Sequence, residues 1–401
     1  MPLSISQRAA NITPSVTLAI DTKAKEMKAA GEDVIGFGAG EPDFDTPAEV
    51  RQAAVYALER GMTRYTPVAG TLELRRAICQ KLARDNGLTY TPAQILVSNG
   101  AKHSLFNTFQ ALLNPGDEVL IPAPWWVSYP EIVRMAGGVP VMVPTTEAEE
   151  FVATAARIAP LVTPRTKALI LNSPNNPNGC VWTRAQLAEI AALAVEKGFY
   201  VVSDEIYEKL LYDGLEHVSI ASLGEEICAQ TIVINGMSKA YAMTGWRIGY
   251  AAGPASVIAA MGNYQSHATS NPNAIAQYAS IVALQSDGAP MREMVQAFDA
   301  RRKALVAGLN AIPGLSCAMP HGAFYVMLNI HGILGKRYGE TVIDSAMTFA
   351  AVLLDAKQVA VVPGEAFAAD GYCRLSYAIS MEALQEGVAR IAQFVDALQQ
   401  P

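Results

Sequence analysis

The chain has 401 residues, of which 51% are hydrophobic and 17% charged, and these values are typical of a globular protein built from two or three structural units. Its 30 basic and 37 acidic side chains leave a net charge of −7, which argues against DNA or RNA as a partner. No apolar run approaches the roughly 18 residues of a membrane helix, and the N-terminus lacks the apolar core of a secretory signal, so we expect no membrane contact.

The cysteines and histidines show no disulfide or ligand pattern. The five cysteines are odd in number, widely spaced and without a CxxC pair, which argues against a disulfide framework or a zinc site and favours the reducing cytoplasm. The five histidines have no HxxxH or similar spacing, so the sequence predicts no metal.

The N-terminal part contains one helical pattern and one glycine pattern. Residues 14–30 are amphipathic and predict a helix. Gly36, Gly38 and Gly40 then form a faint dinucleotide-binding pattern, which keeps a nicotinamide oxidoreductase as one alternative. The pattern runs directly into Glu41-Pro42-Asp43, where a helix cannot begin cleanly, and no strand–helix–strand unit frames it, which argues against that alternative.

Residues 94 to 252 alternate short β-rich runs with helical patterns, which indicates α/β layering. Near-continuous apolar runs such as 232–234 suit strands of a sheet that helices cover on both faces. The segment 183–197, with Thr183 as its cap, is typical of those helices. The seven predicted strands are residues 94–97, 118–121, 139–143, 167–171, 200–203, 231–234 and 248–251.

The pattern changes after about residue 290. A helical pattern over 290–310 precedes strand-like runs near 323–328, 359–362 and 372–376, and an amphipathic helix spans about 381–399. Fewer strands and more helix predict a second, smaller α+β domain. We expect the first 46 residues to pack with it.

Four polar motifs lie where predicted strands end, at residues 98–102, 172–179, 203–207 and 238–239. Ligands of α/β proteins bind at that edge of the sheet. Lys239 leaves a strongly apolar strand there. Loss of water around a lysine lowers its pKa, so that its neutral amine can form a Schiff base. An isolated lysine after a strand would be an ordinary surface residue, but the three neighbouring motifs argue for a function.

Together these motifs resemble the class I aminotransferases, which are fold type I pyridoxal-phosphate enzymes. The resemblance rests on Asn175-Asn176-Pro177, on Ser203-Asp204-Glu205-Ile206-Tyr207, and on Ser238-Lys239 with Arg247 eight residues after the lysine. It extends from residue 39 to residue 378 and is closest to the bacterial and plastid aspartate/prephenate branch. It implies a three-layer α/β/α large domain over 48–288 with a mostly parallel seven-stranded sheet, and a small α+β domain formed by 1–47 and 289–401.

The resemblance implies roles for four residues at the cofactor ring. Lys239 would hold pyridoxal 5'-phosphate as an internal aldimine and, once released by the substrate amine, would move the proton between Cα and the cofactor. Asp204 would pair with the ring nitrogen and so make the ring a better electron sink, although an aspartate in that place alone would more often cap a helix. Asn176 and Tyr207 would donate to the phenolic oxygen; a turn residue and a half-buried helix residue are the alternatives.

The phosphate of the cofactor is implied to bind at the start of a helix. Gly100, Ala101 and Lys102 open that helix, whose first N–H groups suit a phosphate, and Ser238 and Arg247 resemble the remaining phosphate ligands.

Tyr65 resembles the tyrosine that reaches the phosphate of the neighbouring subunit, which implies a homodimer with shared active sites. Otherwise Tyr65 is a loop residue at an ordinary surface.

The substrate is implied to lie between an aromatic side chain and an arginine. Trp126 resembles the residue stacked on the cofactor ring, and its register favours it over the adjacent Trp125. Arg374 resembles the arginine that clamps the substrate α-carboxylate, because a planar fork suits a carboxylate. Gly40 resembles a backbone donor near that carboxylate, and Asn176 and Trp126 also border the substrate.

Lys102 and Thr17 are the residues that the resemblance links to specificity. In this branch a lysine at the first position pairs with the distal carboxylate of aspartate, glutamate or prephenate, and a threonine that Thr17 matches assists it. The alternative for Lys102 is that it only adds charge for the phosphate. The helix over 14–30 resembles a lid that closes on a bound diacid; a permanently docked helix is the alternative.

The implied reaction is ping-pong transamination of the amino acid aspartate with the oxo acid 2-oxoglutarate, which gives oxaloacetate and glutamate, and use of prephenate stays open. An aromatic or kynurenine-type aminotransferase and a carbon–sulfur lyase of the same fold remain alternatives. So does a regulator that senses the cofactor, for which the sequence has no basic DNA-binding segment.

Overall fold

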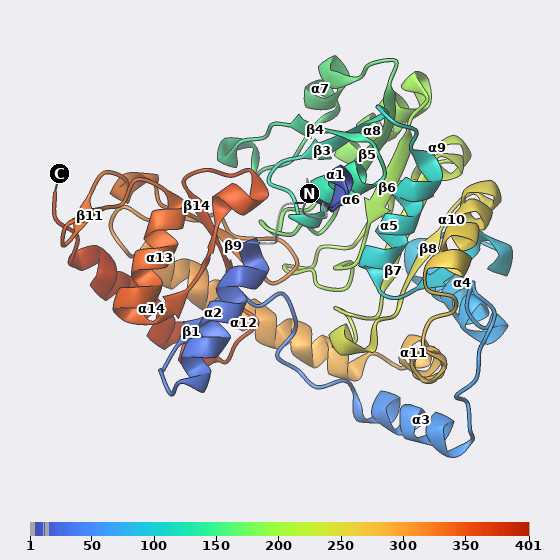
Figure 1. The fold of residues 1–401 in the computed structure, drawn as a ribbon, viewed down its shortest axis with the longest axis horizontal. Coiled ribbons are helices and arrows are strands. Elements are labelled where there is room, and N and C mark those ends of the chain that lie inside the picture. Colours follow the sequence, from blue (N-terminus) through green and yellow to red (C-terminus); the bar gives the residue numbers. More distant parts are fainter. Residues whose placement is uncertain (1–4, 11, 13–15, 401) are drawn as a thin grey trace.

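The computed structural model describes residues 5–10, 12 and 16–400, without the side chains of residues 7–8 and 16–21. Two sheets of different size, together with two short strand pairs, organise the chain. The larger sheet and its helices form one part of the molecule, and the smaller sheet, near β9 and β14, lies beside it (Figure 1).

The larger sheet has the strand order β2-β8-β7-β6-β5-β3-β4. All neighbouring strands are parallel except those of β8, which is antiparallel to β2 and β7. This confirms the prediction of a mostly parallel seven-stranded sheet. Its strands are β2 (Ile95–Ser98), β3 (Glu118–Pro122), β4 (Val139–Val143), β5 (Thr166–Asn172), β6 (Tyr200–Asp204), β7 (Thr231–Gly236) and β8 (Gly249–Ala252).

Helices cover both faces of this sheet because its strands are apolar on both. In β5, Ala168 and Ile170 pack with α5 (Ala101–Leu112), α6 (Ser128–Met135) and α10 (Ala255–Ala268). Leu169 and Leu171 pack with α8 (Arg184–Lys197) on the other face. Alternate side chains of a strand point to opposite faces, so an uninterrupted apolar run produces three layers. A further cluster joins α3 (Ala48–Glu59), α4 (Leu72–Asn86) and α11 (Ala274–Gln285) to β2 and β8.

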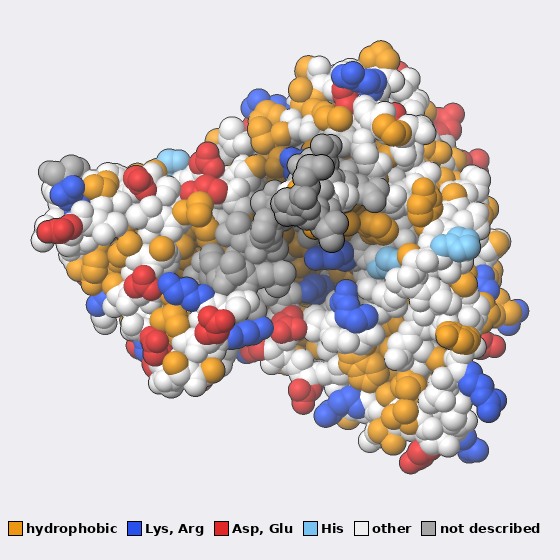
Figure 2. All heavy atoms as spheres, in the orientation of Figure 1, with side chains coloured by type: hydrophobic (Ala, Val, Ile, Leu, Met, Phe, Trp, Pro, Cys, Tyr) orange, Lys and Arg blue, Asp and Glu red, His pale blue; other side chains and the backbone are white. Residues whose placement is uncertain are grey.

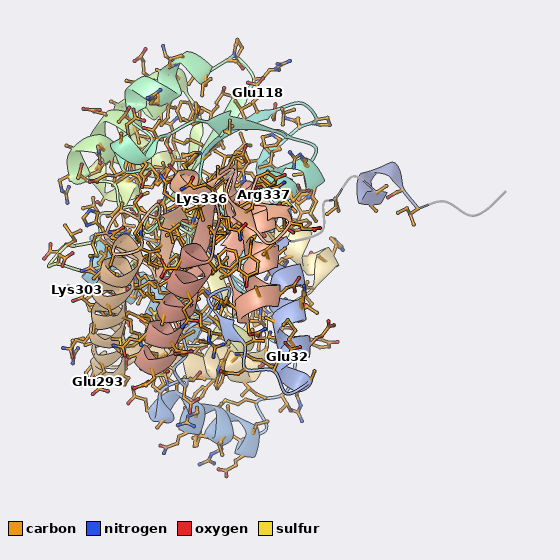
Figure 3. The ribbon with its side chains drawn as sticks, turned by 90° about the vertical axis from the view of Figure 1, so that its left-hand side faces the viewer. Glu32, Glu118, Glu293, Lys303, Lys336 and Arg337 are labelled. Atoms are coloured by element: carbon orange, nitrogen blue, oxygen red, sulfur yellow. The ribbon has the colours of Figure 1, made fainter. Side chains whose placement is uncertain are left out.

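The smaller sheet is antiparallel and has the order β13-β14-β9. Its strands are β9 (Tyr325–Asn329), β13 (Val362–Pro363) and β14 (Tyr372–Ser376), and it shares one core with α12 (Ala289–Asn310), α13 (Ala346–Lys357) and α14 (Met381–Asp396). α12 buries Met294, Phe298 and Leu305 in that core and exposes Glu293 and Lys303 on its outer side (Figure 3). The helices predicted over 290–310 and 381–399 are therefore present.

Two elements of the N-terminal segment contact this smaller part. β1 (Ile35–Gly36) pairs in parallel with β12 (Val359–Ala360), and α2 (Val16–Ala29) contacts β12 and β13. The predicted helix over 14–30 is thus α2. The domain boundaries at 47/48 and 288/289 stay a prediction.

The remaining short elements are α1 (Gln7–Ala10), α7 (Ala155–Ile158), α9 (Glu225–Ala229), β10 (Arg337–Tyr338) and β11 (Thr341–Val342). None of the described helices is long and apolar enough to cross a membrane. On the face shown in Figure 2, basic and acidic side chains are interspersed among polar and hydrophobic ones.

Candidate active site

A cavity of about 600 Å³ lies at the carboxyl ends of the main-sheet strands. Asn172 and Asp204 end β5 and β6, Ser238 and Lys239 follow β7, and Arg374 comes from β14 of the smaller sheet. Both parts of the molecule therefore contribute residues to the lining of this cavity. Of the residues predicted for the site, its lining includes Gly40, Ala101, Lys102, Trp126, Asn176, Asp204, Tyr207, Ser238, Lys239, Arg247 and Arg374.

Lys239 places its amine near aromatic rings. Its Nζ donates a hydrogen bond to the carbonyl of Gly40 and lies 5.8 Å and 5.7 Å from the ring centres of Tyr207 and Phe324. Removal of water from the amine lowers the pKa of Lys239 to about 8. A neutral amine is consequently available near neutral pH.

Asp204 ends β6 and is 3% exposed. Its Oδ2 accepts a 2.7 Å hydrogen bond from the Tyr129 hydroxyl, and its Oδ1 accepts one of 3.3 Å from the Ile206 N–H. Burial raises the pKa of Asp204 to about 6, although these donors act in the opposite direction. A turn rather than a helix follows β6, so Asp204 does not have the helix-capping role that its position alone would suggest.

A chain of hydrogen bonds and ring contacts surrounds Arg374, which is 3% exposed. Its Nη1 donates to Asn176 Oδ1 at 3.0 Å, and its Nη2 donates to the Gly38 carbonyl at 2.9 Å. The guanidinium carbon lies 4.5 Å from the ring centre of Tyr325, whose hydroxyl is 3.0 Å from that of Tyr207. Burial lowers the pKa of Arg374, and its buried Nε has no hydrogen-bond partner among the residues that the structure describes.

The start of α5 is packed against Arg247. Gly100 has a φ of 87°, and a Cβ at this position would lie 2.3 Å from Nη2 of Arg247, so only glycine fits. The first N–H groups of a helix have no partner within it and suit an anion, and in α5 these groups belong to Ala101 and Lys102. Loss of water and the positive charge of Arg247 lower the pKa of the adjacent Lys102.

Of the two adjacent tryptophans, Trp126 lines the cavity. Its ring meets Tyr129 edge to face at 5.3 Å, and Lys102 Nζ lies 4.8 Å from its ring centre. Trp125 lines a neighbouring cavity instead, and its backbone N–H donates to the Phe367 carbonyl. That Trp126 faces the cofactor ring stays a prediction.

Two predicted site residues, Tyr65 and Gly100, do not line the cavity in the described part of the chain. Tyr65 is 92% exposed in the loop between α3 and α4. Gly100 packs against the Arg247 guanidinium. Thr17 belongs to α2, but its side chain lies outside the described residues.

Several lining residues were not predicted. Tyr129 follows Trp126 by three residues and points to the same sheet edge, so the spacing from Trp126 could have revealed it. Tyr325 lies within an apolar strand-like run and carries no signal of function in the sequence. Glu41, Lys25 and Lys28 also line the cavity.

The lining is strongly cationic. Among the side chains that the structure describes, Glu41 and Asp204 are its acidic residues, against six basic ones, which are Lys25, Lys28, Lys102, Lys239, Arg247 and Arg374. Among the described residues, no carboxylate forms an ion pair with Lys102, Lys239, Arg247 or Arg374. A cavity with this excess of basic side chains fits a ligand that brings several negative charges.

The family model and the similar proteins of known name all indicate the same family. Residues 32–391 match the model of the class I and II aminotransferases. The chain is 50% identical over 395 residues to an aspartate aminotransferase of Geobacillus stearothermophilus, with 98% of this chain and 100% of the relative covered. It is 44% identical over 396 residues to an aspartate/prephenate aminotransferase of Nitrosomonas europaea, with 98% and 100% covered.

Solved structures of aspartate aminotransferases are also similar to this chain in fold and in sequence. The aspartate aminotransferase from Rhizobium meliloti has a TM-score of 0.96 and 44% identity, with 99% of this chain and 100% of that chain covered. The Thermus thermophilus aspartate aminotransferase with maleate has a TM-score of 0.93 and 46% identity, with 98% and 100% covered. The chain therefore belongs to the class I and II aminotransferases, and its cationic cavity with a lysine amine and a buried aspartate fits the pyridoxal 5'-phosphate that this family uses.

Proposed function

We propose that this protein is a pyridoxal-phosphate-dependent aminotransferase that transfers the amino group of aspartate to 2-oxoglutarate, with prephenate as a further acceptor. The observation that carries the proposal is one cavity that contains the Lys239 amine, the buried Asp204 carboxylate and the buried Arg374 guanidinium. Relatives named aspartate aminotransferase and aspartate/prephenate aminotransferase support the choice of substrates.

The cofactor would be held at both ends. Gly100, Ala101 and Lys102 at the start of α5, with Ser238 and Arg247, would bind its phosphate. Asp204 would pair with the ring nitrogen, Asn176 and Tyr207 would donate to the phenolic oxygen, and Trp126 would stack on the ring. Bound there, pyridoxal phosphate supplies an electron sink for the negative charge that forms at the substrate Cα.

Lys239 would move the proton in this reaction. Its pKa of about 8 leaves part of the amine neutral near pH 7.5, so Nζ can accept the proton from the substrate Cα and return it as an acid. Asp204 stays ionised above its pKa of about 6. Both groups therefore have the required charge in the same pH range.

Arg374 would bind the α-carboxylate of the substrate. It is buried, and among the described residues it forms no ion pair with a carboxylate, so a substrate carboxylate would supply the missing negative charge. Asn176 already accepts from Nη1 of Arg374 and would keep the guanidinium in place. The backbone of Gly40 would border the same carboxylate.

Lys102 would recognise the distal carboxylate, with Thr17 from α2 assisting. Lys102 lies against the ring of Trp126 at the cavity wall, where a charge pair is stronger than in bulk water. Ala24, Lys25 and Lys28 of α2 also line the cavity, which supports a role for this helix as a lid over a diacid.

The functional unit would be a homodimer in the cytoplasm. Tyr65 projects almost fully exposed from its loop, as a residue that completes the partner's phosphate site would. All five cysteines are free thiols, which suits a reducing compartment.

Product analysis tests the proposal. The purified protein with pyridoxal phosphate should form oxaloacetate and glutamate from aspartate and 2-oxoglutarate, and should show a visible absorption band that borohydride removes. Release of pyruvate and a thiol from cystathionine would indicate a carbon–sulfur lyase instead, and turnover restricted to aromatic donors would indicate an aromatic or kynurenine-type enzyme.

A further inference from the structure

The charge of Asp204 depends on its hydrogen-bond donors, because a buried carboxylate has lost the water that would stabilise its ionised form. Two donors reach it among the described residues: the Tyr129 hydroxyl at 2.7 Å from Oδ2 and the Ile206 N–H at 3.3 Å from Oδ1. The first has the length of a strong hydrogen bond, whereas the second is at the long end of the range. Tyr129 is thus the main support of this carboxylate.

Packing fixes Tyr129 in place. The side chain is 2% exposed, and its ring meets that of Trp126 edge to face at 5.3 Å. It belongs to the same apolar cluster as Ile132 and Val133 of α6. Burial and the neighbouring charge of Asp204 raise the pKa of Tyr129 well above its ordinary value, so the hydroxyl keeps its proton and acts as a donor.

We propose that Tyr129 is a positioning residue for the transamination reaction: it holds the Asp204 carboxylate ionised and oriented for the ring nitrogen of the cofactor. This inference rests on the proposed function. Trp126 and Tyr129 lie three residues apart where the chain enters α6, so one short segment both covers the ring face and supports Asp204. A shift of this segment would change both contacts together.

The test is Tyr129→Phe in the full-length holoenzyme, which removes the hydroxyl and keeps the ring. We expect kcat with aspartate to fall about 10- to 100-fold, the effect of one hydrogen bond to a charged group, with KM changed less than about twofold. Equilibrium dialysis should show pyridoxal phosphate retained about tenfold more weakly. The pH midpoint of the visible absorption band should move upward, because a ring nitrogen that holds its proton less firmly withdraws less electron density.

A double-mutant cycle separates this role from a purely structural one. If Tyr129 acts through Asp204, Tyr129→Phe should weaken pyridoxal phosphate retention by less than about twofold in the Asp204→Asn background. The matched control is Tyr90→Phe, which removes another buried hydroxyl, 3.6 Å from Cys228 Sγ, and should behave as the wild type. A folded Tyr129→Phe protein with unchanged retention and midpoint, or equal losses in both backgrounds, would overturn the inference. A wild-type protein that takes up no pyridoxal phosphate would instead refute the proposed function.

Discussion

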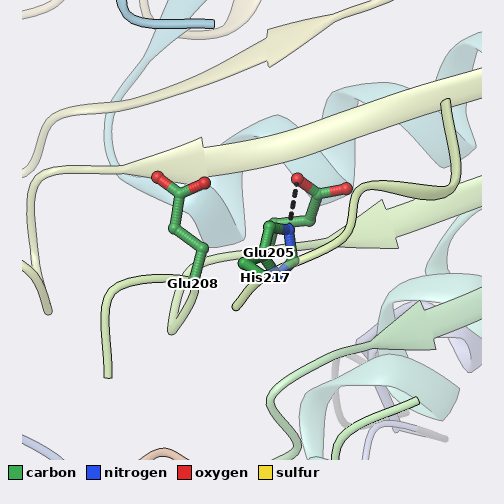
Figure 4. Close-up of side chains that lie close together, drawn as sticks. All are labelled: Glu205, Glu208 and His217. Carbon is green, nitrogen blue, oxygen red and sulfur yellow. Dashed lines mark hydrogen bonds and ion pairs between the residues drawn. The ribbon is translucent and has the colours of Figure 1, made fainter. Parts of the chain in front are cut away.

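The turn after β6 has charged side chains on two sides, and the two sides differ in how those charges are satisfied. Asp204 and Tyr207 line the cavity, whereas Glu205 and Glu208 belong to a buried cluster with His217 (Figure 4). Lys81 of α4 completes that cluster. Asp204 and Glu205, which are adjacent in sequence, therefore lie in two different environments.

Every charge in the buried cluster has a partner within the chain. Glu208 pairs with Lys81 and accepts a 2.8 Å hydrogen bond from Asn86. Glu205 lies 3.0 Å from His217 Nε2 and accepts from Ser203 and Ser219. Ligand atoms of Glu205, Glu208 and His217 lie within 4.8 Å of one another, but these partners already satisfy the carboxylates.

The cavity is the opposite case, since Lys102, Lys239, Arg247 and Arg374 form no ion pair with a carboxylate among the described residues. The same contrast separates two buried arginines. Arg302 pairs with Asp213 at 2.8 Å and Asp299 at 2.5 Å, whereas Arg374 forms no such pair within the described part of the chain. Removal of one partner from a buried pair destabilises the fold, whereas a charge left without a partner indicates where a ligand binds.

Lys239→Ala in the cavity and Lys81→Ala in the buried cluster form the first pair of variants, and they should have the largest effects. Lys239→Ala should lower turnover of aspartate by at least about 10³-fold, because it removes the amine that would move the proton at the substrate Cα, and should leave the melting temperature of the apoprotein nearly unchanged. Lys81→Ala leaves Glu208 buried without its cation and should cost about 3–5 kcal/mol of unfolding free energy. Urea unfolding and initial rates measured on both proteins check this, and a Lys239→Ala enzyme with normal turnover would contradict it.

Arg374→Lys and Arg302→Lys form a second pair. The first should raise KM for aspartate about 10- to 100-fold, because an ammonium cannot bind a carboxylate through two parallel hydrogen bonds. The second should lower the unfolding midpoint with KM unchanged. Steady-state kinetics and thermal melts distinguish the two; a similar loss of affinity in both proteins would remove the special role of Arg374.

The Glu208 pair predicts a pH dependence of stability. Burial alone would raise the pKa of Glu208, but the charges of Lys81, His217 and Lys209 lower it to about 2 from an ordinary value of 4.5. A lowered folded-state pKa stabilises the protein above about pH 4.5, and this contribution is lost as the pH falls toward 2. Urea midpoints should therefore fall over that range, less steeply in Glu208→Gln; equal slopes would argue against the pair.

Lys102→Ala should have the smallest effect. We expect KM for aspartate to rise about tenfold, the value of one charged contact at a partly wet site, and KM for a neutral amino acid to change little. Equal changes for the two substrates would mean that Lys102 only adds charge for the phosphate.

The sequence allowed much of the main sheet and its edge to be predicted, because both leave local signals. Strands covered on both faces have continuous apolar runs, and polar residues at their ends, such as Asp204 and Lys239, converge wherever parallel strands end. The cluster around Lys81 and Glu208 was not predicted, since it depends on contacts between distant segments. Tyr325 was missed for a related reason: a tyrosine in an apolar strand has the same pattern whether it packs or lines a cavity.

The two-sided turn after β6 also matters for protein engineering. A library that randomises residues 204 to 208 to broaden substrate choice would mostly yield misfolded proteins. Changes at Glu205 or Glu208 would leave other charges of the buried cluster, such as Lys81, without their partners. Useful diversity should instead be sought on α2, because Lys25 and Lys28 of this helix line the cavity and do not belong to the cluster of Glu205, Glu208 and His217.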